Sequence, residues 1–404
     1  MEQVLYKLPV GWEWQTFNDV CTNITDGAHA SPKTVDEGFP YVTVRDVNHK
    51  GQIDLINCKR ISEDDFLSLK KGNCLPPVDS VLLSKDGTVG KVAHVTNDYD
   101  EFVVLSSLAI IVPEQTSLSP EYLKYFLLSP EFQDHAIGSK TGAAIKRIVL
   151  RTIKNFNIPI APLEQQKRIV EKLDSLLTRI DTAIEHLQES VTLADALYAS
   201  ALNELATAVD GKTIKLGELG KIIRGSSPRP KGDPRYYGGS VPRLMVADVT
   251  RDGRYVTPVI DFLTEEGALK SRPVPKGTLT IQVSGNPGMP AILAVDACIH
   301  DGFAALVEIN RESISTEYLY FSLLAVAEQN NQMAVGAIFR NLTTSQLREI
   351  EVIIPSYEKQ LEMVRKMDIA EQKLKVLKAE LNAQLDSIRQ LKASILDSAF
   401  KGDL

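Results

Sequence analysis

A long stretch of the chain places apolar residues at regular helical spacing. It runs from Leu163 to about Leu205, after the proline-containing segment 159–162 and before Gly211, and it contains no proline or glycine. Read in heptads, its seam comprises Val170, Leu173, Leu177, Ile180, Ile184, Leu187, Val191, Ala194, Tyr198, Ala201 and Leu205. A seam that repeats every 3.5 residues is typical of a long helix that packs along another helix.

A second seam follows Pro355 and supplies a candidate partner. It comprises Met363, Met367, Ala370, Leu374, Leu377, Leu381, Gln384, Ile388, Leu391, Ile395 and Ser398. The polar Gln384 has two interpretations that the sequence leaves open: it fixes the register of the helices, or the heptad frame drifts there. We expect antiparallel pairing, because the chain returns through a second mixed segment. The alternative is that each helix packs only on its own domain.

The rest of the sequence repeats itself at about half its length. The order of the matching segments is preserved, which indicates a duplication. The matches are 39–47 with 241–249, 81–90 with 279–288, 119–123 with 315–319, 142–147 with 335–340, and Pro162, Glu164, Gln166, Val170 and Asp174 with Pro355, Glu358, Gln360, Val364 and Asp368.

Each repeat predicts short strands followed by helices. The β-branched and apolar runs 41–47 and 103–112 predict strands, and 120–132 predicts a helix that Ser119 caps. We therefore predict an α+β fold, in which two similar domains and two long helices are related by a pseudo-two-fold internal repeat, with the helices forming an antiparallel coiled coil. The predicted segments are domain 1–160, helix 161–208, domain 209–355 and helix 356–404.

Composition narrows the class of protein. The 404 residues are 44% hydrophobic and 24% charged, which excludes a disordered chain. The start of the sequence does not resemble a signal peptide, no apolar run is long enough to span a membrane, and the four cysteines have no metal-binding spacing. We expect a cytoplasmic protein with no membrane partner. The scattered histidines predict no metal site, and no P-loop or other catalytic motif is present, which favours a binding or scaffolding protein.

The charge is distributed unevenly. The net charge is −7, which argues weakly against nucleic-acid binding, yet segments 139–155 and 221–254 are rich in Lys and Arg. Polar glycine-bearing loops occupy equivalent places at 25–32 and 223–228. Arg, Asn and Ser suit phosphates and base edges, although an ordinary solvated loop is the alternative. The candidate DNA-binding residues are Arg45, Lys140, Lys146, Arg147, Arg224, Ser226, Arg229, Lys231, Arg243, Asn286 and Arg340.

The chain resembles the specificity (S) subunits of type I restriction–modification systems. Segment 8–14, Leu-Pro-Val-Gly-Trp-Glu-Trp, resembles that family's opening. Segment 162–170, with Leu173 and Asp174, resembles its central motif, and segment 394–404 resembles its C-terminal ending. The start of the second helix departs from the central motif and keeps only Glu358 and Gln360.

The resemblance implies a division of labour. Each target recognition domain would read one half of a bipartite, asymmetric site on double-stranded DNA, and the helices would set the spacing and dock the modification subunits. Those subunits would use S-adenosylmethionine to methylate adenine, and restriction subunits would use ATP and Mg²⁺, while this chain would bind no cofactor and catalyse nothing. The alternatives are a coiled-coil scaffold or regulator of a DNA methyltransferase without sequence-specific DNA contacts, and, more remotely, a standalone enzyme.

Overall fold

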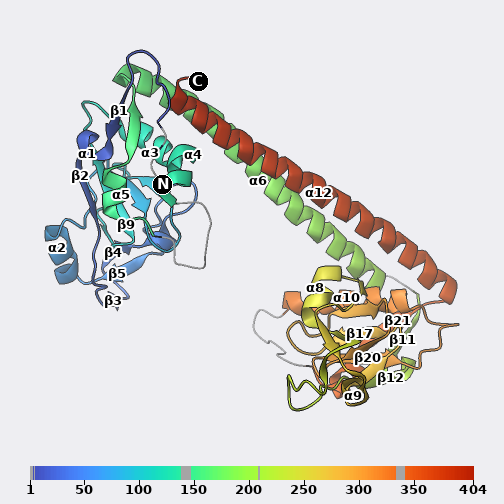
Figure 1. Ribbon diagram of the computed structural model, residues 1–404. Helices are drawn as coiled ribbons and strands as arrows, with labels where there is room; N and C mark the ends of the chain where they lie inside the picture. The colour runs from blue at the N-terminus through green and yellow to red at the C-terminus, as the bar shows by residue number, and fades with distance from the viewer. Residues whose placement is uncertain (1–2, 4, 138–146, 208–209, 334–341) are drawn as a thin grey trace. The chain divides into compact units, whose positions relative to one another are not determined.

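The structure, a computed structural model, describes residues 3, 5–137, 147–207, 210–333 and 342–404. The chain divides into two compact units. Unit 1 comprises Met1–Leu187 and Ala383–Leu404, and unit 2 comprises Gln188–Asn382, so each unit includes part of both long helices. Figure 1 shows their elements.

Unit 1 combines two four-stranded sheets and a two-stranded one. Their strand orders are β2-β9-β6-β7, β3-β5-β4-β8 and β1-β10. The strands are β1 (Glu13–Thr16), β2 (Cys21–Asp26), β3 (Thr34–Val35), β4 (Phe39–Val42), β5 (Lys59–Ile61), β6 (Val81–Ser84), β7 (Val92–His94), β8 (Val103–Val104), β9 (Leu108–Pro113) and β10 (Asn157–Ile160). The helices are α1 (Phe17–Val20), α2 (Glu63–Lys71), α3 (Pro120–Leu128), α4 (Pro130–Ile137) and α5 (Leu150–Lys154).

Unit 2 repeats this plan. Its strand orders are β12-β20-β17-β18-β14, β15-β13-β19-β16 and β11-β21. The strands are β11 (Lys212–Lys215), β12 (Lys221–Arg224), β13 (Tyr237–Leu244), β14 (Tyr255–Val256), β15 (Asp261–Leu263), β16 (Arg272–Val274), β17 (Leu279–Gln282), β18 (Pro290–Leu293), β19 (Ala297–Ile299), β20 (Phe303–Val307) and β21 (Glu351–Ile354). The helices are α7 (Leu216–Leu219), α8 (Val246–Asp252), α9 (Glu265–Leu269), α10 (Thr316–Met333) and α11 (Thr344–Arg348).

The predicted local elements need three corrections. The helix expected over 120–132 ends at Leu128, because Pro130 holds Ser129 in an extended conformation and starts α4. The strand expected over 41–47 ends at Val42. A 3-10 turn (Val44–Asp46) follows, which Thr43 caps: its Oγ1 accepts from the Arg45 N–H, and the Asp46 carboxylate accepts from the Thr43 N–H at 2.7 Å. The run 103–112 is divided into β8 and β9 by a turn.

The long helices are α6 (Leu163–Thr207) and α12 (Tyr357–Lys401), and they pair antiparallel. In unit 1 the first part of α6 contacts the last part of α12, where Lys392 Nζ lies 2.5 Å from Asp181 Oδ1. In unit 2 the last part of α6 contacts the first part of α12, where Lys378 Nζ lies 2.8 Å from Asp195 Oδ1. The predicted antiparallel pairing is confirmed.

The predicted seam of α6 is also confirmed. Leu173, Leu177, Ile180 and Ala194 are buried. The half-buried members are Val170, Ile184, Leu187, Val191, Tyr198 and Ala201. The side chain of Leu205 lies outside the described residues.

The predicted seam of α12 is partly wrong. Met363, Met367 and Leu381 are buried, and Ala370, Leu374, Ile388, Ile395 and Ser398 are half-buried. Leu377 and Leu391, however, are 44% and 52% exposed, and Gln384 is exposed. The inner positions are one residue further on, at Lys378, Leu385, Lys392 and Ala399.

Two physical effects explain this shift. A straight helix with 3.6 residues per turn drifts away from a 3.5-residue repeat, so its inner face departs from a heptad frame. Lys378 and Lys392 are also half-buried at these inner positions, since a lysine can bury its aliphatic stem while its ammonium group pairs with α6. Of the two interpretations of Gln384, drift of the frame is therefore the correct one.

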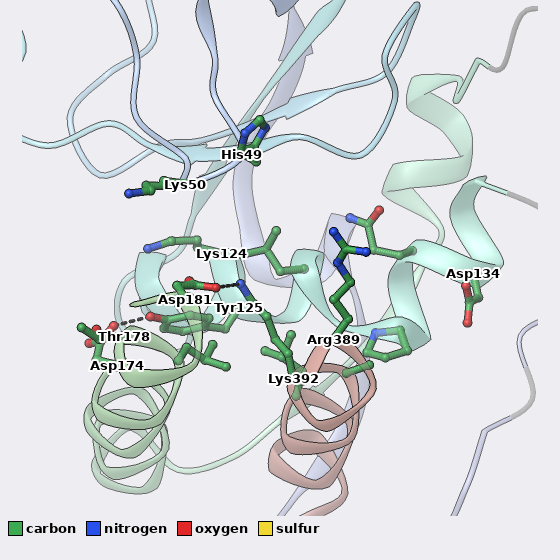
Figure 2. Close-up of a pocket in the computed structure, with 16 residues that line it drawn as sticks. His49, Lys50, Lys124, Tyr125, Asp134, Asp174, Thr178, Asp181, Arg389 and Lys392 are labelled. Atoms are coloured by element: carbon green, nitrogen blue, oxygen red, sulfur yellow. Dashed lines mark hydrogen bonds and ion pairs between the residues drawn. The ribbon is translucent and has the colours of Figure 1, made fainter. Parts of the chain in front are cut away.

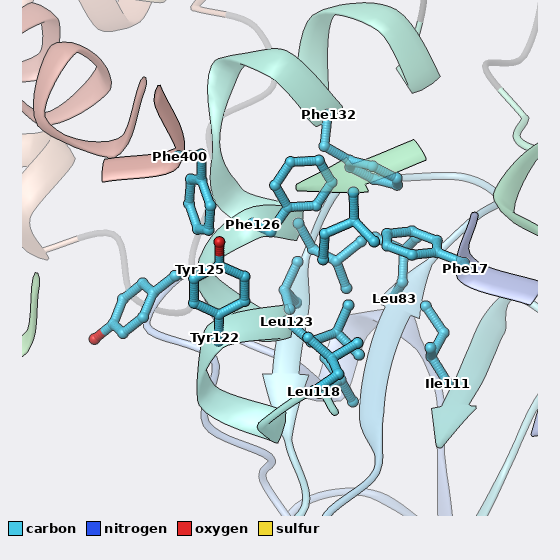
Figure 3. Close-up of a cluster of buried hydrophobic side chains, with 14 of the residues drawn as sticks. Phe17, Leu83, Ile111, Leu118, Tyr122, Leu123, Tyr125, Phe126, Phe132 and Phe400 are labelled. Carbon is cyan, nitrogen blue, oxygen red and sulfur yellow. The ribbon is translucent and has the colours of Figure 1, made fainter. Parts of the chain in front are cut away.

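The end of α12 belongs to the core of unit 1. The ring of Phe400 lies edge-on to Tyr122 and Phe126 of α3, with centroid distances of 5.0 and 5.1 Å. Figure 3 shows these rings in one cluster with Phe17 and Phe132. In unit 2, Leu202 of α6 and Met363 and Met367 of α12 join the corresponding core. Each domain is thus fastened to both helices by apolar contacts.

Candidate nucleic-acid interface

Two glycines start the equivalent polar loops. Gly27 follows β2 and Gly225 follows β12. A Cβ added to Gly27 would lie 1.9 Å from Val104 O, and one added to Gly225 would lie 2.0 Å from His300 O. Both positions therefore exclude a side chain, since the loop backbone passes directly against a neighbouring carbonyl. This shared feature supports the equivalence that the sequence repeat predicted.

In unit 2 the loop is held by hydrogen bonds on two sides. Ser226 Oγ donates to Lys270 O at 3.3 Å, and Ser271 Oγ donates to Ser226 O at 2.7 Å. Ser227 Oγ donates to Asp301 Oδ1 at 2.7 Å, and this bond is the main cause that lowers the pKa of Asp301. The candidate Ser226 is therefore half-buried within a fixed loop.

Arg243 lies beneath this loop. Its side chain is buried, its guanidinium pairs with Asp261, and its Nη2 donates to Ser227 Oγ at 2.7 Å. The guanidinium also lies 5.4 Å from the centre of the Tyr237 ring. This placement does not present Arg243 to a phosphate in solvent. It corrects the sequence-based expectation and makes Arg243 a support for the loop.

His300 borders the same network. Its Nδ1 accepts a hydrogen bond from the Gly302 N–H at 2.8 Å, and its ring lies edge-on to Phe303. Burial, and then the positive charge of Arg243, lowers its pKa. The ring is therefore held in its neutral form, as an acceptor, at the base of the loop.

Around the loop lies a surface of exposed cations. We call Arg224, Arg229, Lys231, Lys270 and Arg272 the unit 2 basic cluster; all five residues are exposed. Arg229 Nη2 lies 3.5 Å from Asp301 Oδ2. Arg224 is fixed in place, because its Nε and Nη2 donate to Asp301 O at 3.0 and 2.8 Å.

Sequence reasoning did not find Lys270 and Arg272. They flank Ser271, which bonds to the loop, and Arg272 Nε donates to Arg224 O at 3.3 Å. They lie more than forty residues from the loop in sequence, in a segment without a recognised repeat match, and tertiary contacts bring them to it. Only the charge of the residues could have drawn attention to them.

Unit 1 places fewer described cations at its loop. Asp26 ends β2, and its carboxylate forms a buried ion pair with Lys85 at 2.9 Å. Arg147 reaches the same region: it bridges to Asp86, and its exposed guanidinium Nε lies 3.7 Å from Asp86 Oδ2. Arg45 is exposed on the 3-10 turn after β4. The candidates Lys140, Lys146 and Arg340 lie outside the described residues.

Asn286 lies on a tight turn that both units share. Gly285 and Gly288 have φ values of +84° and +95°, and Gly87 and Gly90 have +74° and +94° in the corresponding turn of unit 1. Gly288 N–H donates to Gln282 O at 2.8 Å, as Gly90 N–H donates to Ser84 O at 2.9 Å. Asn286 is exposed and lines a hollow described below.

Among the described residues, no group of acidic, histidine and cysteine side chains could hold a metal ion. Within the same ranges, no helix has the length and apolar character needed to cross a membrane.

The duplicated α+β domains, the paired helices and the equivalent glycine-started polar loops define a class of protein, a two-domain chain built by internal repetition. More particularly, the chain belongs to the family of the type I restriction modification DNA specificity domain, which matches residues 9–193 and again residues 208–387. The resemblance predicted from the sequence is confirmed.

Similar proteins cover nearly the whole chain. The putative type I restriction enzyme MjaX specificity subunit of Methanocaldococcus jannaschii is 21% identical, over 98% of this chain and 95% of its own length. The StySPI specificity subunit of Salmonella potsdam and the EcoKI specificity subunit of Escherichia coli are each 22% identical, over 98% of this chain and 90% of their own lengths.

Solved structures share the fold. A chain from work on complex assembly and conformational transition of the type I R-M system is 22% identical, with a TM-score of 0.76 over 99% of this chain and 100% of the other. The HsdS subunit from Thermoanaerobacter tengcongensis is 23% identical, with a TM-score of 0.56 over the full length of both chains. The predicted α+β fold with its internal repeat is confirmed.

Proposed function

We propose that this chain is the DNA specificity subunit of a type I restriction–modification complex. Family membership over both repeats is the observation that carries the proposal. Each domain would read one half of a bipartite, asymmetric site on double-stranded DNA. The unit 2 basic cluster would contact phosphates. The loop at Ser226 and Ser227, which Arg243 supports, would approach the bases.

The chemistry would belong to other subunits. Modification subunits, docked on the paired helices, would transfer a methyl group from S-adenosylmethionine to adenine. Restriction subunits would use ATP and Mg²⁺. The chain itself would be non-catalytic and would select the site and set the spacing between its halves.

Genome-wide adenine methylation tests this proposal. Cells that carry the gene should methylate one bipartite motif that is lost when the gene is deleted, while the modification subunits are still produced. Exchanging residues 212–354 for those of a relative should change one half of the motif and keep the other. Methylation that persists unchanged after deletion, or that has no sequence preference, would favour the scaffold or regulator alternative.

A further inference from the structure

Each unit has a hollow at the same position of the repeat. In unit 1 a cavity of about 580 Å³ lies between α3, the loop at Lys50, and the paired segments of α6 and α12 (Figure 2). In unit 2 a cavity of about 560 Å³ lies between α10, the loop at Gly253, and its own segments of α6 and α12. The same sequence offset separates Gln166 from Gln360 and Leu202 from Leu396. Leu202 lines the unit 2 cavity and Leu396 lines the unit 1 cavity, so the two cavities occupy equivalent positions of the repeat.

The unit 1 hollow contains its own cations. Arg389, Lys392 and Lys124 line it. Figure 2 shows Lys392 donating to Asp181, at 2.5 Å, and the Tyr125 hydroxyl donating to Asp174. Both acidic residues that α6 contributes to this lining, Asp174 and Asp181, therefore have partners within the chain.

The unit 2 hollow has the opposite character. Asp195, Tyr198 and Tyr320 stand where unit 1 has Arg389, Lys392 and Lys124. Its acidic lining residues are Asp195, Glu328 and Glu371, and no Lys, Arg or His is among the described residues that line it. Lys378 pairs with Asp195 and Arg254 pairs with Glu371, both from outside the lining. Glu328 forms no ion pair with any residue that the structure describes.

A buried acceptor at the floor of the hollow points to a ligand. Gln282, at the end of β17, is 2% exposed and lines the cavity. Its Oε1 atom is buried and has no hydrogen-bond partner among the described residues. In unit 1 the equivalent residue is Ser84, whose Oγ donates to Thr88 O at 2.7 Å and accepts from the Lys91 N–H at 2.7 Å. The unsatisfied acceptor is thus a feature of unit 2.

These features match one chemical group. A guanidinium presents several N–H donors in one plane, so it can donate to Gln282 Oε1 and to the Glu328 carboxylate together. Its flat face can also stack on the ring of Tyr198, which lines the cavity, whereas the ring of Tyr320 already lies 6.0 Å from the guanidinium of Arg254. The acidic lining disfavours a phosphate or a carboxylate.

We propose that the unit 2 hollow is the docking site for an arginine side chain of the modification subunit. The inference rests on the proposed function, because it requires that modification subunits bind this chain. Charge complementarity selects the occupant: unit 1 has Lys124, Arg389 and Lys392 in its lining, whereas the described lining of unit 2 has no cation and leaves Glu328 and Gln282 Oε1 without a described partner. The two hollows would then make chemically different contacts with the modification subunits.

Charge-changing variants of the full-length chain test the proposal in binding to purified modification subunits. Glu328→Lys should raise the Kd about tenfold or more, and Glu328→Gln should raise it less. Glu312→Lys is the matched control, since Glu312 is exposed in unit 2 but does not line the hollow. Agmatine, a small guanidinium compound, should compete with assembly of the wild-type chain and not with that of Glu328→Lys. Unchanged thermal melting would show that the variants fold.

Several results would overturn the proposal. One is a Glu328→Lys chain that binds modification subunits as tightly as the wild type does. Another is that agmatine raises the melting temperature of the isolated chain but does not affect its binding to modification subunits. That result would indicate a site for a small cationic ligand. A third is a Glu328→Lys effect that disappears in an Arg340→Ala background, because the chain's own arginine would then be the occupant. If the wild-type chain binds no modification subunit, the proposed function itself fails.

Discussion

Gln166 and Gln360 occupy the same position in the two long helices and make the same hydrogen bonds. Gln166 Oε1 accepts from the Ser119 N–H at 2.9 Å, and its Nε2 donates to Ser117 O and Ala161 O at 2.7 and 2.8 Å. Gln360 Oε1 accepts from the Ser315 N–H at 2.9 Å, and its Nε2 donates to Ser313 O and Pro355 O, both at 3.0 Å. Both side chains are fully buried. One amide thus ties each long helix to the start of α3 or α10.

Replacing either glutamine should destabilise its own unit. Gln166→Leu retains the approximate volume but leaves three backbone groups without their side-chain partner, at about 1–3 kcal/mol for each group that water cannot reach. Gln360→Leu should have a similar effect on unit 2. The measurement is the free energy of unfolding in urea, with the exposed Gln372→Leu as control. Equal stability of Gln166→Leu and the control would show that these bonds do not fasten the helix.

The position of the α12 seam can be tested with two leucines. Leu385 is 5% exposed, whereas Leu391 is 52% exposed, although only Leu391 lies in the heptad frame predicted from the sequence. Leu385→Ala should lower the free energy of unfolding by about 2–5 kcal/mol. Leu391→Ala, which serves as its control on the same helix, should change it by less than about 0.5 kcal/mol. A larger loss of unfolding free energy for Leu391→Ala than for Leu385→Ala would instead support the heptad frame predicted from the sequence.

The basic cluster of unit 2 should make DNA binding dependent on salt. Removing the exposed cations Arg229 and Lys231 should lower the salt slope of log K by about 0.9 for each phosphate that the variant no longer neutralises. Arg235→Ala is a control, because that guanidinium is already held by Asp233 at 2.7 Å. Titrations at several salt concentrations should show weaker binding through the half-site of unit 2 alone. An equal weakening at both half-sites would contradict the assignment of one domain to each half.

Acid should weaken unit 2 through His300. Its folded pKa lies below the ordinary value of about 6.5, so the unfolded chain binds a proton more readily. Stability is therefore complete above the unfolded pKa and falls as pH drops toward the folded pKa. The melting temperature should be lower at pH 5.5 than at pH 7.5, and the difference should be smaller in His300→Asn. If the variant keeps the full pH dependence, other groups cause it.

The sequence predicted the features that depend on local pattern. The repeat and the α6 seam follow from residue order and apolar spacing, and both agree with the structure. The α12 seam was misplaced because an apolar scale does not credit the lysine stems at Lys378 and Lys392 with packing. Pro130 divided a predicted helix that its apolar residues would have continued.

Prediction of the interface was less successful, because it depends on depth and long-range contacts. Arg243 and Arg229 look alike in the sequence, yet one is buried in a network and the other is exposed. Lys270 and Arg272 reach the loop only through the fold. The unpaired Oε1 of Gln282 likewise depends on which neighbours surround β17, and no sequence pattern reports that.

Antiparallel strand pairs close each domain directly before its helix. Glu13 of β1 lies opposite Ile160 of β10, and Lys212 of β11 lies opposite Ile354 of β21. The chain therefore enters and leaves each domain at neighbouring points. The segment between these points begins and ends at the same place beside the long helices. Such a segment can be exchanged by genetic recombination as a cassette, without rerouting the backbone. Under the proposed function, such an exchange would give a new recognition sequence in one step and would leave the two long helices unchanged.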